Sequence, residues 1–160
     1  MDYKRIFGSG PTGIIVTVVI WTAALQLEGL LGIPRIHMPV TFQWIMFGFF
    51  AIDATITILW SFWVLPPKKW GTFLVTKGPF HLVRHPLYSA FIWSGTGMVA
   101  MGFRSWVVLF SVILVNFFWT WHIRKEENYM LELFGEEYRR YMEKTGQFFP
   151  RFGKNDRKAL

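Results

Sequence analysis

The sequence predicts an all-α membrane protein, with four transmembrane helices followed by a charged helical segment outside the bilayer. Hydrophobic residues make up 52% of the 160 residues, and aromatic residues make up 19%, which is too apolar for an ordinary soluble domain. A helix needs about 20 mostly apolar residues to cross the hydrocarbon core. Apolar runs near that length cover residues 13–33, 40–65, 86–103 and 105–122.

Prolines and a short polar turn separate these runs. Pro34 and Pro39 bracket the first connection, and Pro66 with Pro67 ends the second run, because proline cannot continue a helix. Only the sequence Gly-Phe-Arg-Ser at residues 102–105 separates the third run from the fourth. Such a tight turn is typical of two antiparallel neighbours. The third and fourth helices are therefore expected to form a hairpin.

Basic residues are distributed as the positive-inside rule describes. Lys and Arg lie before the first run, in the loop after the second run and from Arg124 onward, whereas only Arg35 and Arg104 fall on the other side. Both termini and the loop 66–85 are therefore expected in the cytosol, in what we take to be a prokaryotic cell membrane. The net charge of +7 then suits anionic lipid headgroups, and no nucleic-acid partner is predicted.

From Arg124 to about Lys144 the apolar pattern gives way to a charged helix, with a turn at Phe134-Gly135. This segment is too polar to cross the bilayer, so it is expected to continue the fourth helix and fold back along the interface. Residues 1–160 are expected to form one domain. The absence of Cys excludes disulfides, thiolate-bound metals and thiol nucleophiles, and no metal site is predicted.

The first segment suited to chemistry is the loop before the third helix. Pro86 suits the first turn of a helix and keeps His85 out of the α region, so free backbone amides are expected there. With Arg84 beside it, this helix start could hold the carboxylate of an amino-acid-like cofactor. In the other interpretation, Arg84 and His85 simply anchor a helix end at the interface.

The second segment lies where the fourth helix leaves the bilayer. His122 and Glu126 are four residues apart and share a helical face, and Glu127 lies one step around. A carboxylate there could pair with a cationic amine or accept hydrogen bonds from ribose hydroxyls. The alternative is a solvated run of charges in which Arg124 and Lys125 balance the glutamates.

Three motifs occur in a fixed order: Arg-His-Pro-Leu-Tyr at residues 84–88, Glu-Glu at 126–127 and Phe-Gly-Glu-Glu-Tyr at 134–138. Together they resemble the signature of the isoprenylcysteine carboxyl methyltransferase and phospholipid methyltransferase group of integral membrane enzymes. Three ordered elements are far more specific than any one of them. The similarity covers roughly residues 71–152.

The resemblance implies that S-adenosylmethionine binds in a cytosolic pocket made by residues 71–88 and 122–152, with S-adenosylhomocysteine as the product. It also implies a lipid or other hydrophobic acceptor that enters from the membrane. The first four implied cofactor contacts would act largely through backbone groups. The implied contacts are Thr72, Phe73, Leu74, Val75, Phe80, His85, Pro86, Leu87, Tyr88 and Glu126.

Arg84, His122 and Glu127 are the predicted catalytic residues. Arg84 and His122 are expected to face the acceptor, and if the acceptor is an amine, His122 or Glu127 could take its proton. His122 stands where the prenylcysteine enzymes place a substrate-binding arginine, and Phe80 stands where an aromatic residue with a hydroxyl is common. The acceptor therefore stays open between a prenylated thiol acid, a phospholipid headgroup amine and another hydrophobic molecule.

Two other functions fit part of the same sequence. Four short helices with an acid such as Asp53 inside a predicted crossing would also suit a small proton-coupled transporter. A relative that shares the C-terminal fold but uses another nucleotide is the second alternative. The oligomeric state is not predicted.

Overall fold

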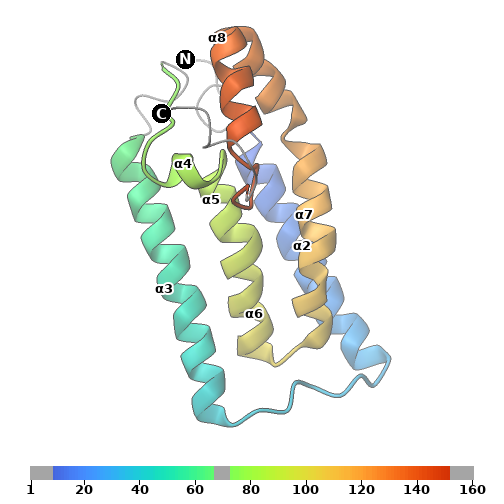
Figure 1. The fold of residues 1–160 in the computed structure, drawn as a ribbon. Coiled ribbons are helices and arrows are strands. Elements are labelled where there is room, and N and C mark those ends of the chain that lie inside the picture. The colour runs from blue at the N-terminus through green and yellow to red at the C-terminus, as the bar shows by residue number, and fades with distance from the viewer. Residues whose placement is uncertain (1–8, 67–72, 152–160) are drawn as a thin grey trace.

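The computed structural model describes residues 9–66 and 73–151, and these residues fold almost entirely into helices (Figure 1). Within the described ranges there is no strand, only an isolated parallel bridge between Val83 and Gly146. The all-α prediction is confirmed. The helices are α2 (Gly10–Leu30), α3 (Val40–Val64), α4 (Pro79–Leu82), α5 (Pro86–Ser89), the π-helical segment η2 (Ala90–Gly95), α6 (Thr96–Phe103), α7 (Trp106–His122) and α8 (Arg124–Lys144).

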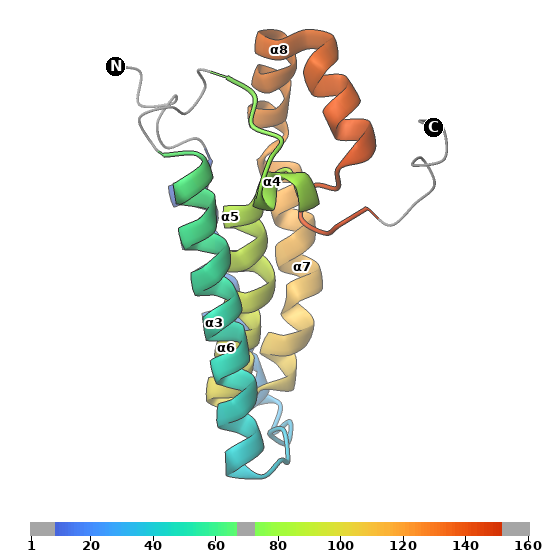
Figure 2. The same ribbon diagram turned by 60° about the vertical axis from the view of Figure 1, so that its left-hand side comes forward.

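Helices α2, α3 and α7 stand side by side, and α4 and α8 lie toward one end of the bundle (Figures 1 and 2). Helices α2, α3 and α7 run alongside a continuous rod made of α5, η2 and α6. The start of α2, the short helix α4 and all of α8 lie at the same end, and the connection between α2 and α3 lies at the other. This arrangement brings polar segments from distant parts of the chain together.

Two of the described helices, α2 and α3, are each long and apolar enough to cross a membrane. The number rises to three if α7 and α8, which meet at a bend of 40°, are taken as one broken span. The rod from α5 to α6 is not one of these candidates, because the π-helical segment leaves α5 and α6 as separate short helices. The predicted count of four crossings therefore stays a prediction.

The first helix lies earlier in the chain than the sequence predicted, since α2 begins at Gly10 instead of residue 13 and ends at Leu30 instead of residue 33. Pro11 suits the first turn, because its fixed φ matches a helix and its missing N–H would have no partner there. At the other end, Gly32 adopts a φ of 61°, and the amide of Ile33 donates to the carbonyl of Glu28 at 3.1 Å. A left-handed glycine of this kind closes a helix.

The third predicted crossing, residues 86–103, also differs from a regular α-helix, because residues 90–95 form a π turn. Turns of this type insert into α-helices and often occur near functional sites. The turn after it is the one predicted: Arg104 adopts a left-handed conformation with a φ of 53°, and the hydroxyl of Ser105 accepts a hydrogen bond from the amide of Val108 at 3.0 Å. The predicted hairpin is confirmed.

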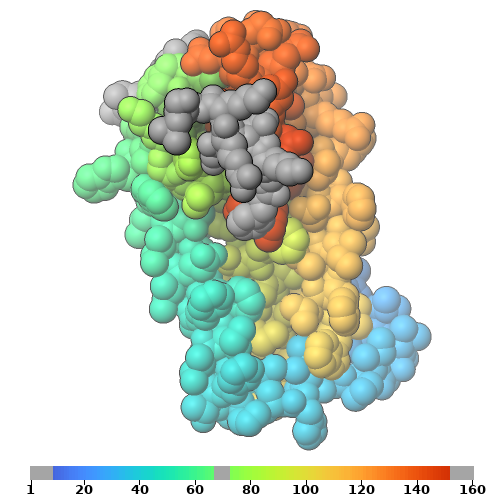
Figure 3. Space-filling view, in the orientation of Figure 1, coloured from blue at the N-terminus to red at the C-terminus, as the bar shows by residue number. Residues whose placement is uncertain are grey.

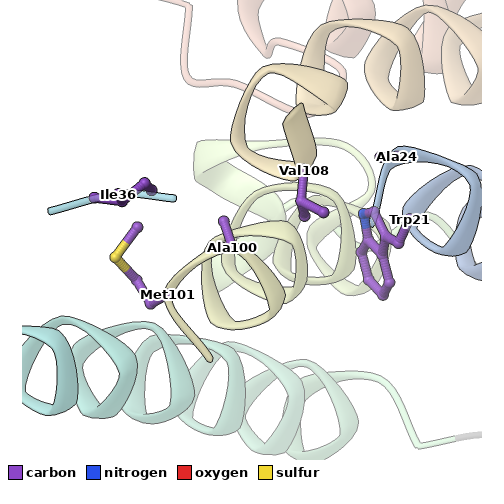
Figure 4. Packing of buried hydrophobic residues seen from close by; sticks show 6 residues of the cluster. All are labelled: Trp21, Ala24, Ile36, Ala100, Met101 and Val108. Carbon is purple, nitrogen blue, oxygen red and sulfur yellow. The ribbon is translucent and has the colours of Figure 1, made fainter. Parts of the chain in front are cut away.

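The core of the bundle joins α2, α6 and α7 (Figure 4). Trp21 reaches across from α2, and its indole N–H donates to the hydroxyl of Thr96 at 3.1 Å. In contrast, α3 lies at the edge of the molecule, where Figure 3 shows its side chains projecting outward. Apolar side chains such as Phe49 and Trp63 are exposed there, by 61% and 88%. Exposed apolar side chains of this kind suit contact with acyl chains.

Candidate active site

The loop before α5 and the first turn of α8 meet at one end of the bundle. The Nε and Nη2 atoms of Arg84 donate to Oε1 of Glu127 at 2.9 and 2.8 Å, and Nε2 of His85 lies 3.3 Å from the same oxygen. The side chains of Arg84 and Glu127 are only 9% and 10% exposed. The structure therefore brings together the two segments that the sequence marked as suited to chemistry.

Arg84 also binds the last turn of α8 and the chain that follows it. Its Nη1 atom donates to the carbonyl of Thr145 at 2.5 Å and to that of Met142 at 3.3 Å. Its backbone amide donates to the carbonyl of Gly146 at 2.8 Å. Every nitrogen of the guanidinium thus has a protein acceptor, and the side chain ties three segments together.

Residues 145–148, here called the C-terminal segment, pack across the start of α5. The amide of His85 donates to the carbonyl of Gln147 at 3.1 Å, and the hydroxyl of Ser89 donates to the carbonyl of Phe148 at 2.7 Å. The side-chain amide of Gln147 reaches Oε2 of Glu127 at 3.1 Å. Phe148 is buried in a cluster with residues of η2 and α7, so the segment is anchored at both ends.

The charge on Glu127 is maintained by its neighbours. Burial alone would raise the pKa of this carboxyl, because it disfavours the charged form. The hydrogen bond from His85 and the positive charge of Arg84 outweigh burial and hold the pKa below its ordinary value of 4.5. Glu127 is therefore a carboxylate at neutral pH.

Helix α8 reverses at Gly135, whose φ of 53° and ψ of −127° interrupt the helical geometry. Figure 2 shows the two limbs of α8 standing beside each other above the bundle. The second limb carries Tyr138 and Tyr141 back to the site, where the Tyr141 hydroxyl donates to the carbonyl of Phe80 at 2.5 Å. Burial raises the pKa of both tyrosines, and the nearby charge of Glu127 adds to the rise at Tyr138. Both hydroxyls stay neutral, and that of Tyr141 acts as a donor.

Glu126 faces a different set of partners from Glu127. Its Oε2 atom accepts hydrogen bonds from the hydroxyl of Ser9 at 2.8 Å and from that of Tyr88 at 3.2 Å. Among the described residues, none donates to its Oε1 atom. One oxygen of this carboxylate is fixed, and the other keeps its capacity to accept a hydrogen bond.

An aromatic group separates Glu126 from the apolar core. The rings of His85 and Tyr88 stack with centroids 5.6 Å apart and an interplanar angle of 10°. Tyr88 also packs on Trp119 at 4.6 Å, and the buried indole of Trp119 donates to Thr17 at 2.8 Å. These contacts hold Tyr88 against α7 and aim its hydroxyl at Glu126.

His122 is the last residue of α7 and lies beside the first turn of α2. Its Nε2 atom is 2.9 Å from the hydroxyl of Thr12 and 3.0 Å from the carbonyl of Ser9. Its ring stacks on Phe118 with centroids 5.0 Å apart. His122 and Glu126 therefore share Ser9 as a partner, the first through its carbonyl and the second through its hydroxyl.

The other residues assigned to cofactor binding lie at the same end in varied surroundings. Phe73, in the extended stretch before α4, is 44% exposed. Phe80 lies in α4 and offers its carbonyl to Tyr141. Thr72 lies outside the described residues. The remaining ones, in the extended stretch or in the first turn of α5, are Leu74, Val75, Pro86 and Leu87.

Nothing in the sequence indicated that Ser9 and Thr12 belong to this site, and Gln147 was included only as part of the predicted cofactor-binding segment 122–152. Ser9 and Thr12 precede the first predicted crossing, so they were expected to flank it. One local signal was present: serine followed by proline two positions later is typical of a helix start. It would have placed the beginning of the first helix correctly, although not its contact with α8.

The fold and the site define a helical membrane protein with a buried cluster of Arg, His and Glu at one end of its bundle. Residues 41–132 match the Isoprenylcysteine carboxyl methyltransferase (ICMT) family. The chain belongs to this family, as the three sequence motifs indicated.

Curated relatives include enzymes and metal-resistance proteins. The chain is 42% identical over 79 residues to a protein-S-isoprenylcysteine O-methyltransferase of Schizosaccharomyces pombe, covering 48% of this chain and 33% of the relative. It is 38% identical over 79 residues to that of Saccharomyces cerevisiae, covering 48% and 32%. It is also 33% identical over 98 residues to the cobalt-zinc-cadmium resistance protein CzcN of Cupriavidus metallidurans, covering 61% and 44%. The matches thus span less than half the length of these relatives.

Proposed function

We propose that this chain is a membrane methyltransferase that uses S-adenosylmethionine and acts on a lipid-like acceptor at the cytosolic face. One observation carries the proposal: the Arg-His-Pro helix start and the paired glutamates, 43 residues apart at Arg84 and Glu127, meet at 2.8 Å. Membership in the ICMT family supports the reaction type. The names of the fungal relatives support an O-methyl transfer.

The residues present fit such a methyl donor. One carboxylate oxygen of Glu126 accepts no hydrogen bond from the residues that the structure describes, which suits a ribose hydroxyl or a cationic amine. The stacked rings of His85 and Tyr88 lie beside that carboxylate. When bound, S-adenosylmethionine would supply a methyl group activated by its sulfonium. The protein's part is to hold the reacting groups aligned and to exclude water.

The predicted catalytic residues then divide into two groups. All the guanidinium nitrogens of Arg84 donate hydrogen bonds to protein oxygens. Arg84 would therefore bind the methyl acceptor only by giving up one of these hydrogen bonds. We therefore assign Arg84 and Glu127 to holding the C-terminal segment against the site. His122 remains as the residue that orients an acceptor carboxylate when charged, or takes the proton of an acceptor amine when neutral.

We further propose that all 160 residues act as one domain with four crossings: α2, α3, the rod from α5 to α6, and α7. Both termini and the active end would face the cytosol of a prokaryotic cell. The parallel course of these helices in Figure 1 supports the count. The basic residues near the active end support the orientation.

The decisive experiment measures transfer of a labelled methyl group from S-adenosylmethionine to a total lipid extract in detergent. We expect a labelled lipid from the natural protein and none from Glu126→Ala, which should also lose binding of S-adenosylhomocysteine in calorimetry. Glu136→Ala is the matched control, because Glu136 lies on the same helix with a side chain that is 70% exposed. Unchanged binding in Glu126→Ala would refute the cofactor assignment. If the natural protein transfers no methyl group, and Asp53→Asn abolishes the protein's function in cells while Glu126→Ala does not, the results would favour a transporter.

A further inference from the structure

The first turn of α2 contacts the proposed site in an unusual way. Ser9 occupies the position before the helix, where a serine side chain normally accepts a hydrogen bond from the helix amides. Here it makes no such cap, and its hydroxyl is donated to Glu126 at 2.8 Å. The next residue, Gly10, is buried, and a Cβ atom there would lie 3.5 Å from the Tyr88 hydroxyl. Ser9 therefore stabilises the orientation of Glu126 instead of its own helix.

The same turn determines which nitrogen of His122 carries a proton. The carbonyl of Ser9 can only accept, so Nε2, which lies 3.0 Å away, must be the donor. Thr12 agrees with this assignment: its single hydroxyl proton is donated to the Ser9 carbonyl at 3.1 Å, which leaves its oxygen to accept from Nε2 at 2.9 Å, so that the one Nε2 proton is shared between the Ser9 carbonyl and the Thr12 oxygen. In the neutral ring, Nδ1 is then the nitrogen with a free lone pair.

The chemical consequence follows from the proton count. Among the described residues, none forms a hydrogen bond with Nδ1 of His122. A neutral imidazole fixed in this tautomer can accept a proton only at Nδ1. The methyl acceptor would therefore give its proton to Nδ1 of His122, whereas Nε2 would hold the ring in place.

We propose that residues 9–12 form a positioning element of the methyl-transfer site. Ser9 fixes one oxygen of Glu126, and the Ser9 carbonyl with the Thr12 hydroxyl holds His122 as the Nε2–H tautomer. This role rests on the proposed function and deepens it. The first turn of α2 becomes the third part of the site, together with the loop before α5 and the first turn of α8. None of the three motifs in the sequence includes these residues.

The tautomer can be measured without a cofactor or an acceptor. With ¹⁵N-histidine in the detergent-solubilised protein at alkaline pH, where an imidazole is neutral, the His122 signals should show a protonated Nε2 and an unprotonated Nδ1. His122→Gln assigns them among the four histidines. Thr12→Val should increase the share of the other tautomer. The control Thr22→Val removes a hydroxyl that bonds only to the carbonyl of Val18, and it should change nothing.

A predominant Nδ1–H tautomer in the natural protein would overturn the assignment. Identical spectra of Thr12→Val and Thr22→Val would overturn the part given to Thr12. This measurement stays informative even if the protein transfers no methyl group. Failure of the proposed function and failure of this inference are therefore distinguishable.

The role of Ser9 is tested by donor binding. Ser9→Ala should raise the dissociation constant of S-adenosylhomocysteine about tenfold, because a hydrogen bond to a charged group is lost. Ser9→Thr, which keeps the hydroxyl, should restore binding, whereas a merely structural role would not separate the two variants at equal thermal stability. Equal binding by Ser9→Ala and the natural protein would overturn the proposal. Absence of binding to the natural protein would instead refute the proposed function.

Discussion

Arg84 and Glu127 depend on each other because each is a charge with little access to water. A buried charge without a partner is costly, whereas an exposed pair contributes little. The chain contains both cases. The Arg84–Glu127 pair is about nine-tenths buried, while Arg139 and Glu136 pair at 3.1 Å with side chains 64% and 70% exposed.

Replacing Arg84 with Ala should therefore destabilise the protein by about 3–5 kcal/mol, since Glu127 would be left buried and unpaired. The C-terminal segment would also lose the donor to Thr145. Arg139→Ala, the matched control, should cost less than about 1 kcal/mol. Thermal unfolding in one detergent measures both changes. Equal effects of the two substitutions would contradict the importance of burial at this pair.

The depressed pKa of Glu127 predicts a pH dependence with a definite sign. The unfolded carboxyl titrates near 4.5 and the folded one below it, so the unfolded state binds the proton first as the pH falls. The stabilisation is complete above pH 4.5 and declines as the pH drops through the folded pKa. The stability difference between the natural protein and Glu127→Gln should shrink over that acidic range. A difference that stays constant there would show that Glu127 titrates normally.

At the scale of elements, the site depends on how α8 turns. The first limb carries Glu126 and Glu127, and the second returns Tyr138 and Tyr141 to the loop before α5. The reversal occurs at Gly135, in a region of backbone space that residues with a side chain rarely adopt. A single backbone conformation thus decides whether the two limbs meet the site together.

Gly135→Ala should destabilise the protein by about 1–3 kcal/mol through backbone strain. A Cβ atom there would meet no other atom within 4 Å, so crowding is not the reason. Gly48→Ala is the control: it lies inside α3 with equally open space and without a positive φ, and it should be neutral or slightly stabilising. Denaturation midpoints distinguish the two. A neutral Gly135→Ala would mean that α8 can turn without a left-handed residue.

Much of the element scale could be predicted from the sequence. Long apolar runs and prolines predicted the all-α class and the end of α3 within one residue. The π turn at residues 90–95 was missed because no local pattern signals it, whereas the early start of α2 was missed although Ser9 and Pro11 are a local signal for it. The Ser9–Glu126 contact joins residues 117 positions apart. No local pattern signals a hydrogen bond over that distance, whereas the glutamates and the Arg-His-Pro start could be predicted because they form motifs.

For the whole molecule, the decisive question is which end faces the cytosol. The loop 31–39 lies at one end of the bundle and α8 at the other. Positive charges gather at the α8 end, and under the positive-inside rule this distribution supports the proposed cytosolic position of that end. The apolar outer face of α3 fits a position against lipid in this orientation.

Single cysteines can test this orientation, because the natural chain has none. In intact cells, a membrane-impermeant maleimide should label Arg35→Cys and leave Glu136→Cys unmodified until the cells are lysed. Both positions are exposed to solvent, so access to the reagent depends on the side of the membrane. The unaltered protein, which should not react, is the control. Labelling of Glu136→Cys alone in intact cells would place the active end outside.

The bond between Ser9 and Glu126 has a consequence for biosynthesis. Ser9 leaves the ribosome early, and its partner follows 117 residues later. During translation, α2 is therefore made before the Glu126 carboxylate that accepts the hydrogen bond of the Ser9 hydroxyl. The proposed donor site can form only after the last helix has emerged, so under this proposal a nascent chain has no complete site until translation has passed the paired glutamates.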